Sequence, residues 1–345
     1  MRQNRHTQDE VIDHRIGALT LSTGTLLIIS AVVFLAAVIL MAVVPLIWDN
    51  YYFLSVLSTT GLYIILVTGL NVLLGYTGLV SLGQAGFYAV GAYASGILVA
   101  KAGAPFVLGL LLAMLLSGVI GLIIGLSSVR LRGGYLAMVT LGFGTVVQII
   151  MINWDDLTGG AEGIWGIPPV GFGQLKIVTP LAWYYTIFII AGLIVLLTYS
   201  LERSRIGRAW MALREDVAAA QMMGINPVHY RLLAFVVSAV YSGIAGALFT
   251  HLNGSVFPDA FGLQTYIMIL MMLILGGSGH ILGPIMGAAI VNVGFEILRP
   301  FGNYQSLVFG FLIVLMAVFM PQGFMGLWRR LAALWGEHSP KQAGN

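Results

Sequence analysis

Long apolar stretches separated by short polar segments dominate the chain. Ten of these stretches are candidates for membrane-spanning helices, because a helix needs about 20 apolar residues to cross the hydrocarbon core. Glycines crowd the ends of the third, eighth and ninth stretches, which therefore give the weakest helical pattern. The ten stretches cover residues 24–46, 51–74, 84–100, 105–127, 135–153, 181–199, 231–251, 263–277, 281–299 and 304–320. The pattern predicts an all-α, polytopic integral membrane protein with about ten transmembrane helices.

The composition agrees with a protein that lies in lipid. Of its 345 residues, 59% are hydrophobic and only 8% are charged, whereas about 25% of the residues of a soluble domain are charged. The chain contains no cysteine, which excludes disulfides and thiol chemistry. No small-residue cleavage site follows the first apolar stretch, so we expect this stretch to stay as an anchor.

The positions of Lys and Arg predict the orientation in the membrane, because these residues concentrate in cytoplasmic loops. With the N-terminus inside and ten alternating spans, thirteen of the sixteen basic residues lie on the cytoplasmic side. The three on the outside are Lys101, Lys176 and Arg299. Both termini are therefore expected in the cytoplasm. Removing two adjacent spans would keep this distribution, so eight spans stay open.

This topology divides the chain into a cytoplasmic segment 1–23, one transmembrane domain 24–320 and a cytoplasmic tail 321–345. The domain includes a charged cytoplasmic loop at 200–230. The outer connection 154–180 is rich in Gly and Pro and is expected to be an irregular surface loop.

Motifs for an enzyme or an ion-coupled carrier are missing from the sequence. It holds no GxxxxGK[ST] phosphate loop and no HExxH motif, and its six histidines are scattered, so no metal, cofactor or catalytic residue is predicted. Glu296 is the ionisable side chain within a predicted span that could serve transport. It lies three residues before Arg299, and this spacing suits a surface ion pair. A proton relay is therefore disfavoured. Such a protein is either a passive channel or takes energy from a partner.

The charged loop contains a predicted helix over 204–223. Ser204 suits its N-cap, and Gly224 followed by Asn226 and Pro227 suits its end. Its apolar residues form one helical stripe, consisting of Ile206, Trp210, Leu213, Val217 and Ala220. A helix lying flat on the inner leaflet would have the same pattern, so this alternative stays open.

Small side chains at Ala218, Ala219 and Ala220, followed by Gly224, resemble the EAA loop of bacterial ABC importer permeases. That loop forms the coupling helix that docks in a cleft of the ATPase subunit. Ala218 stands where the pattern has Glu. The candidates for supplying the missing carboxylate are Glu215 and Asp216. The resemblance assigns a set of residues to coupling with an ATPase: Arg208, Arg214, Glu215, Asp216, Ala218, Ala219, Ala220, Gly224, Ile225 and Asn226.

Further blocks resemble the branched-chain amino-acid ABC transporter permease family, M-type (LivM) subunit. They lie between residues 75 and 327 and include GYTGLVSLGQAGFYAVGAY, RGGYLAMVTLGFG, LTGGAEGIWGIP, LMMLILGGSGHILGPIMGAAI and FMPQGFMGL. The resemblance implies an importer subunit in the bacterial inner membrane. Its implied partners are a homologous H-type permease, two cytosolic ATPases and a periplasmic binding protein that delivers Leu, Ile or Val.

Spans two to five form one group and spans seven to ten form another. The first group begins on the outer side of the membrane and the second on the inner side, which is the layout of an inverted repeat. In each group the first span is followed by a glycine-rich break, at 75–86 and 253–262. A path for a zwitterion with an apolar side chain needs sparse polar groups. The candidates are Asn71, Ser81, Gln84, Thr140 and Gln148. These groups could equally bridge helices by hydrogen bonds.

The acidic residues Asp155, Asp156 and Glu162 of the outer loop are candidates for docking the binding protein. A solvated loop is the alternative. For the whole chain, a channel or secondary carrier and a membrane enzyme stay open behind the ABC permease. Within the permease family, urea and short amides are alternative substrates.

Overall fold

The computed structural model describes residues 50–128, 131, 133–172, 175–304, 307, 308, 310 and 311. The chain divides into two units, residues 1–54 and 55–345, and residues 50–54 are the described part of the first. The predicted span 24–46, most of the span 304–320 and both terminal segments lie outside the described residues.

Six helices in the described part are long and apolar enough to cross a membrane. Helix α2 (Tyr51–Leu70) continues as the π-helix η1 (Asn71–Tyr76). The other five are α3 (Gln84–Ala102), α4 (Phe106–Ser128), α5 (Gly134–Asn153), α7 (Pro180–Arg203) and α10 (Pro227–Asn253). Each coincides with a predicted stretch to within four residues at either end. The prediction of an all-α polytopic membrane protein is confirmed at this level.

Two further apolar helices are shorter. Helices α11 (Leu263–Gly276) and α12 (Leu282–Ile297) have 14 and 16 residues, so they extend about 21 and 24 Å at 1.5 Å per residue. They pack closely on each other, since a Cβ built at Gly287 would be 2.7 Å from the carbonyl carbon of Met272. By length alone neither helix would span a hydrocarbon core of about 30 Å.

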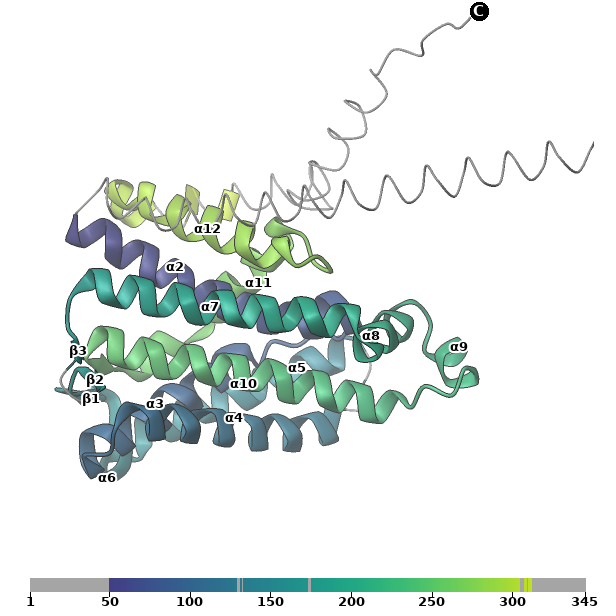
Figure 1. The fold of residues 1–345 in the computed structure, drawn as a ribbon, viewed down its shortest axis with the longest axis horizontal. Coiled ribbons are helices and arrows are strands. Elements are labelled where there is room, and N and C mark those ends of the chain that lie inside the picture. Colours follow the sequence, from purple (N-terminus) through teal and green to yellow (C-terminus); the bar gives the residue numbers. More distant parts are fainter. Residues whose placement is uncertain are drawn as a thin grey trace, which may run out of the picture. The chain divides into compact units, whose positions relative to one another are not determined.

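The centre of the second unit is built where α3, α4 and α10 pack together. Glycines allow the backbones of α3 and α10 to approach: a Cβ built at Gly91 would lie 2.7 Å from the carbonyl carbon of Gly243. In Figure 1, the axes of α7, α10 and α4 are nearly parallel, with α6 (Asp155–Thr158) and the strands at one end and α8 and α9 at the other.

The break between η1 and α3 enters the interior. Gln84, the first residue of α3, donates from Nε2 to the backbone oxygen of Leu66 (3.1 Å) and accepts from Ser238 Oγ (3.0 Å). Ser238 lies near the middle of α10, and Leu66 lies ten residues before the end of the continuous span α2–η1. The break 77–83, in which residues 78–83 are non-helical, therefore enters deep into the bundle. Irregular backbone survives at such depth where protein or water satisfies it.

The break after α10 is also non-helical over most of its length. It contains β4 (Ser255–Val256) and the 3-10 turn η3 (Pro258–Phe261), and the ring of Phe261 lies 5.0 Å from that of Tyr88 in α3.

The outer connection 154–180 differs from the irregular loop that we expected. It holds α6, the 3-10 turn η2 (Gly160–Glu162) and three strands, β1 (Ile164–Trp165), β2 (Val170–Phe172) and β3 (Leu175–Ile177). Strand β1 pairs antiparallel with β4, and β2 pairs antiparallel with β3. The partner of β1 thus lies some 90 residues later in the chain, beyond the reach of a local sequence pattern.

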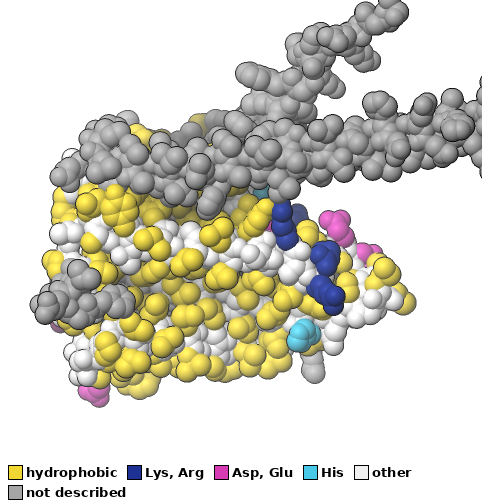
Figure 2. Space-filling view, viewed as in Figure 1, with side chains coloured by type: hydrophobic (Ala, Val, Ile, Leu, Met, Phe, Trp, Pro, Cys, Tyr) yellow, Lys and Arg dark blue, Asp and Glu magenta, His cyan; other side chains and the backbone are white. Residues whose placement is uncertain are grey.

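The surface agrees with a position in lipid. On the face drawn in Figure 2, hydrophobic side chains cover the flank, and Lys, Arg, Asp and Glu side chains gather at the end where α8 and α9 lie. Helix α4 presents a row of exposed leucines to its surroundings: Leu108, Leu111, Leu115, Leu116, Leu122 and Leu126. A bilayer satisfies such a surface, whereas water would not.

Candidate functional site

Helix α8 (Arg205–Glu215) begins the charged loop after α7 and packs against the spans. The hydroxyl oxygen of Ser204 accepts from the backbone N–H groups of Ile206 and Gly207, which confirms the predicted N-cap. Trp210 is fully buried, and its Nε1 donates to the backbone oxygen of Tyr230 at 2.8 Å. The buried apolar side of α8 therefore lies against protein.

The prediction of one continuous helix over 204–223 is wrong. Asp216 adopts extended dihedral angles (φ −152°, ψ 118°) and separates α8 from a second helix, α9 (Val217–Met222). Its Oδ1 accepts from the backbone N–H groups of Ala218 (2.7 Å) and Ala219 (3.1 Å). Asp216 therefore works as the N-cap of α9, and the predicted apolar stripe is interrupted between Leu213 and Val217.

The end of α9 has the geometry that the sequence predicts. Gly224 has a φ of +80°, and the N–H of Ile225 donates back to the oxygen of Ala220 at 3.0 Å, as in a Schellman motif. Asn226 Oδ1 then accepts from Val228 N at 3.0 Å and caps α10, whose first residue is Pro227.

The tip of α9 projects from the molecule. Met222 and Met223 are 90% and 83% exposed, and Ala218 and Ala219 are exposed as well, whereas Ala220 is buried. Figure 1 shows α9 standing out beyond the ends of the long helices. Exposed methionines form an adaptable apolar surface that suits a protein partner.

The four charged residues expected in the coupling set divide into two groups. Arg208, Glu215 and Asp216 are exposed, and Arg208 Nη1 donates to the oxygen of Arg203 at 3.0 Å. Arg214 is also exposed, but its guanidinium reaches toward the spans and donates from Nη1 to the backbone oxygen of Gly75 at the end of η1.

Two of the polar residues expected along a path bridge separate elements. Asn71 is fully buried; its Nδ2 donates to the oxygen of His280 (3.1 Å) and its Oδ1 accepts from the N–H of Gly279 (2.9 Å). Gln84 joins α2 to α10 through the contacts given above.

The other three make contacts to the two breaks between helices. Thr140 Oγ1 accepts from the N–H of Leu82 at 2.9 Å, and Ser81 Oγ accepts from the N–H of Gly83 at 3.3 Å. Gln148 Nε2 donates to the oxygen of Pro258 at 3.2 Å. The structure thus gathers Ser81, Gln84 and Thr140 around the break 77–83, while Asn71 and Gln148 lie at two other places.

The acidic residues of the outer loop share one region. Asp155, Asp156 and Glu162 are all exposed, and Lys101 Nζ donates to the backbone oxygen of Asp156 at 2.5 Å. Asp259 in η3, which we did not single out from the sequence, is also exposed in the segment that pairs with this loop. Its position within the predicted break 253–262 was the available signal.

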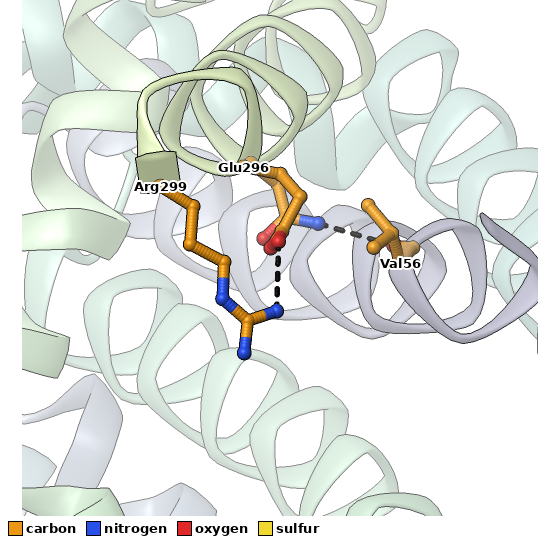
Figure 3. A network of polar contacts seen from close by, with 4 residues as sticks. Val56, Glu296 and Arg299 are labelled. Carbon is orange, nitrogen blue, oxygen red and sulfur yellow. Dashed lines mark hydrogen bonds and ion pairs between the residues drawn. The ribbon is translucent and has the colours of Figure 1, made fainter. Parts of the chain in front are cut away.

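Glu296 makes the surface pair expected from its spacing. Its Oε1 lies 3.0 Å from Arg299 Nη1, as Figure 3 shows next to Val56 of α2. The pair needs no role in transport, because the side chain of Arg299 is largely exposed.

The comparisons with known proteins assign the family. The family model described as "Branched-chain amino acid transport system / permease component" matches residues 52–317. The chain belongs to this family. It is similar to the high-affinity branched-chain amino acid transport system permease protein LivM of Salmonella typhimurium strain LT2, with 38% identity over 298 residues, covering 80% of this chain and 70% of the relative.

Other members have related names. LivM of Escherichia coli strain K12 is 37% identical over 320 residues, which cover 86% of this chain and 75% of the relative. LivH of Salmonella typhimurium, a high-affinity branched-chain amino acid transport system permease protein, is 25% identical over 293 residues. These residues cover 76% of this chain and 91% of the relative. No solved structure matches the chain.

Two features of this permease-family member could not be foreseen from residue type alone. Tyr76 donates from its hydroxyl to Glu202 Oε2 at 3.0 Å, which ties the end of η1 to the end of α7. The exposure of Met222 and Met223 follows from the turn at Asp216. Asp216, which stands two residues before three alanines, was the available signal, since Asp is a preferred N-cap.

Proposed function

We propose that the chain is the permease subunit of an ATP-driven importer that moves Leu, Ile and Val across the bacterial inner membrane. The substrate rests on the names of the LivM relatives. The observation that carries the mechanism is the capped, projecting helix α9 between two long apolar helices, α7 and α10. Since the sequence holds no phosphate loop, the energy comes from separate cytosolic ATPases.

Helix α9 is the segment that docks on an ATPase. Its small side chains at Ala218 and Ala219 allow another surface to approach, and Met222 and Met223 supply apolar contact area. Asp216 and Gly224 fix the two ends of the helix. Arg208 and Glu215 flank it as exposed charges, while Ile225 and Asn226 lead the chain into α10.

Similarity to both LivM and LivH supports a pair of homologous permease subunits in one importer. A binding protein docks at the opposite end, where Asp155, Asp156 and Glu162 are exposed. Neutralising all three should weaken the stimulation of ATP hydrolysis by the binding protein, and the weakening should fade at high salt. An unchanged response at every salt concentration would contradict this docking site.

The topology of the proposal is ten spans with both termini in the cytoplasm. Its support is that a non-helical segment followed by a helix occurs twice, as 77–83 with α3 and 254–262 with α11. A break and the helix that follows it together extend farther across the membrane than the helix alone. In this proposal, the break before α11 makes up for the short length of that helix. The two breaks follow α2–η1 and α10, which run in opposite directions through the membrane, as an inverted repeat requires.

Substrate passes beside these breaks. The irregular backbone offers carbonyl and N–H groups on apolar walls. Ser81, Gln84 and Thr140 form hydrogen bonds at or next to the break 77–83. Asn71 and Gln148 hold the adjoining segments in place.

Reconstitution tests the function. The chain, co-expressed with an H-type subunit, two ATPases and the binding protein, should purify as one complex. In proteoliposomes it should take up labelled leucine only when ATP and the binding protein are both present. Leucine uptake by the chain without the ATPases would instead establish a channel or a secondary carrier.

A further inference from the structure

Three segments that are distant in sequence meet at the backbone of Gly75. They are the π-helix η1 at the end of the first described span, the last turn of α8, and the turn 277–281 between α11 and α12. The three segments belong to a spanning helix, to the charged loop and to the short helix pair. Their meeting point thus joins the loop that carries α9 to the interior.

Asn71 makes the first of these contacts. It is the first residue of η1, where the wider π-helical turn places its side chain against another part of the chain. Both polar atoms of the Asn71 amide bond this turn: Oδ1 accepts from Gly279 N (2.9 Å), and Nδ2 donates to His280 O (3.1 Å). Because Asn71 is fully buried, losing these two bonds would leave polar groups unsatisfied.

The backbones of Gly75 and Gly279 approach too closely for any side chain. A Cβ built at Gly75 would lie 2.6 Å from the nitrogen of Gly279. Gly279 has a φ of +85°, and Gly277 has a φ of +103°, both in the region that favours glycine. A turn with two such glycines can absorb changes in its dihedral angles, as hinges do.

Arg214 closes the junction from the side of α8. Its guanidinium donates to the oxygen of Gly75 and lies against the position that a Cβ at Gly279 would occupy. Its Cγ is 3.3 Å from the place of a Cβ at Gly78. A cation at the carbonyl end of a helix is favourable, so α8 is held to η1 by charge and by packing.

We propose that Arg214 and Asn71 are positioning residues that transmit the movement of the docked α9 to the turn 277–281. This inference rests on the proposed function and adds the link through which the ATPase acts on the spans. When α9 is displaced, α8 moves with it through the cap at Asp216, and Arg214 moves the end of η1 against the α11–α12 turn. Arg214 is exposed like the other charges of this loop, but it differs from them because its guanidinium also bonds the end of η1.

The test compares Arg214→Gln with Arg214→Lys and with Arg205→Gln in the complete reconstituted importer. Arg205 is exposed on the same helix and is not part of the junction, so its variant controls for the lost charge. We expect Arg214→Gln to assemble and to hydrolyse ATP, because α9 is intact. Leucine uptake per ATP hydrolysed should fall by about tenfold or more. Arg214→Lys should restore part of the coupling, and Arg205→Gln should match the wild type.

A second variant links Arg214 to the turn. Gly279→Ala would place a methyl group where the Arg214 guanidinium lies and would strain a positive φ. We expect the same uncoupling, with no further loss when the two changes are combined, since both break one junction. Multiplying losses would show independent effects and would overturn the inference.

Other outcomes are also decisive. Normal uptake per ATP in Arg214→Gln, or loss of assembly and hydrolysis together with uptake, would overturn the coupling role. Failure of the wild-type importer to take up leucine would instead reject the proposed function.

Discussion

At the scale of single residues, Asp216 decides the form of the charged loop. Without it, the apolar spacing from Ile206 to Ala220 would suit one helix. The aspartate takes an extended conformation and binds two N–H groups of the next turn, which redirects the chain and exposes Met222 and Met223. Short polar side chains compete with helix continuation by this kind of local bond.

We therefore expect Asp216→Ala to loosen α9. Loss of an N-cap costs about 1 kcal/mol, so hydrogen exchange at the amides of residues 218–222 should accelerate by roughly fivefold. Asp216→Asn keeps an acceptor oxygen and should exchange like the wild type. Exchange that is equally slow in Asp216→Ala would show that the cap does not hold this helix.

Several residues with local effects were predictable, although the cap at Asp216 was missed, and those with distant partners were not. The caps at Ser204, Gly224 and Asn226 could be predicted because each acts within a few residues of its own backbone. The inward direction of Arg214 depends on Gly75, 139 residues earlier in the chain, and no spacing rule indicates it.

At the scale of elements, close contact between helices is what glycine provides. The crossing of α3 and α10 requires that Gly91 and Gly246 carry no side chain. By contrast, a Cβ built at Gly192 in α7 meets no heavy atom of the described residues within 4 Å. The same residue type thus has two different roles in two helices of one bundle.

The matched variants Gly91→Ala and Gly192→Ala test this contrast. We expect Gly91→Ala to lower the midpoint of thermal unfolding in detergent, because overpacking costs about 1–3 kcal/mol. Gly192→Ala should leave the midpoint unchanged or raise it, because alanine favours a helix over glycine. Equal midpoints for both variants would contradict the close packing of α3 on α10.

The apolar stretches predicted the helices well because span length follows from membrane thickness. Three element-scale features were not predictable in this way. Strand β1 of the outer connection depends on pairing with Ser255 and Val256, and the short α11 follows a break that has no helical pattern. The depth of the break 77–83 depends on the bonds of Gln84 to two other helices.

At the scale of the whole molecule, the account requires charge to lie at two opposite membrane surfaces. Since the natural sequence has no cysteine, single cysteines report their side without background. Cysteines replacing Asp156 and Met222 should react with a membrane-impermeant maleimide from opposite sides, and one replacing Gln342 should react from the same side as the one replacing Met222. Labelling of all three from one side would contradict the ten-span topology.

The central claim is that a cytosolic ATPase drives this permease through α9. Ala219 is exposed on that helix, and a glutamate there would clash with a docked partner and bury an unpaired charge. Ala219→Ser keeps a small side chain and serves as the control. The decisive measurement is ATP hydrolysis stimulated by the leucine-loaded binding protein, together with leucine uptake, in reconstituted importers that carry each variant. We predict that Ala219→Glu inserts into the membrane normally but loses both activities, while Ala219→Ser retains them. Normal stimulation and normal uptake in Ala219→Glu would contradict the account.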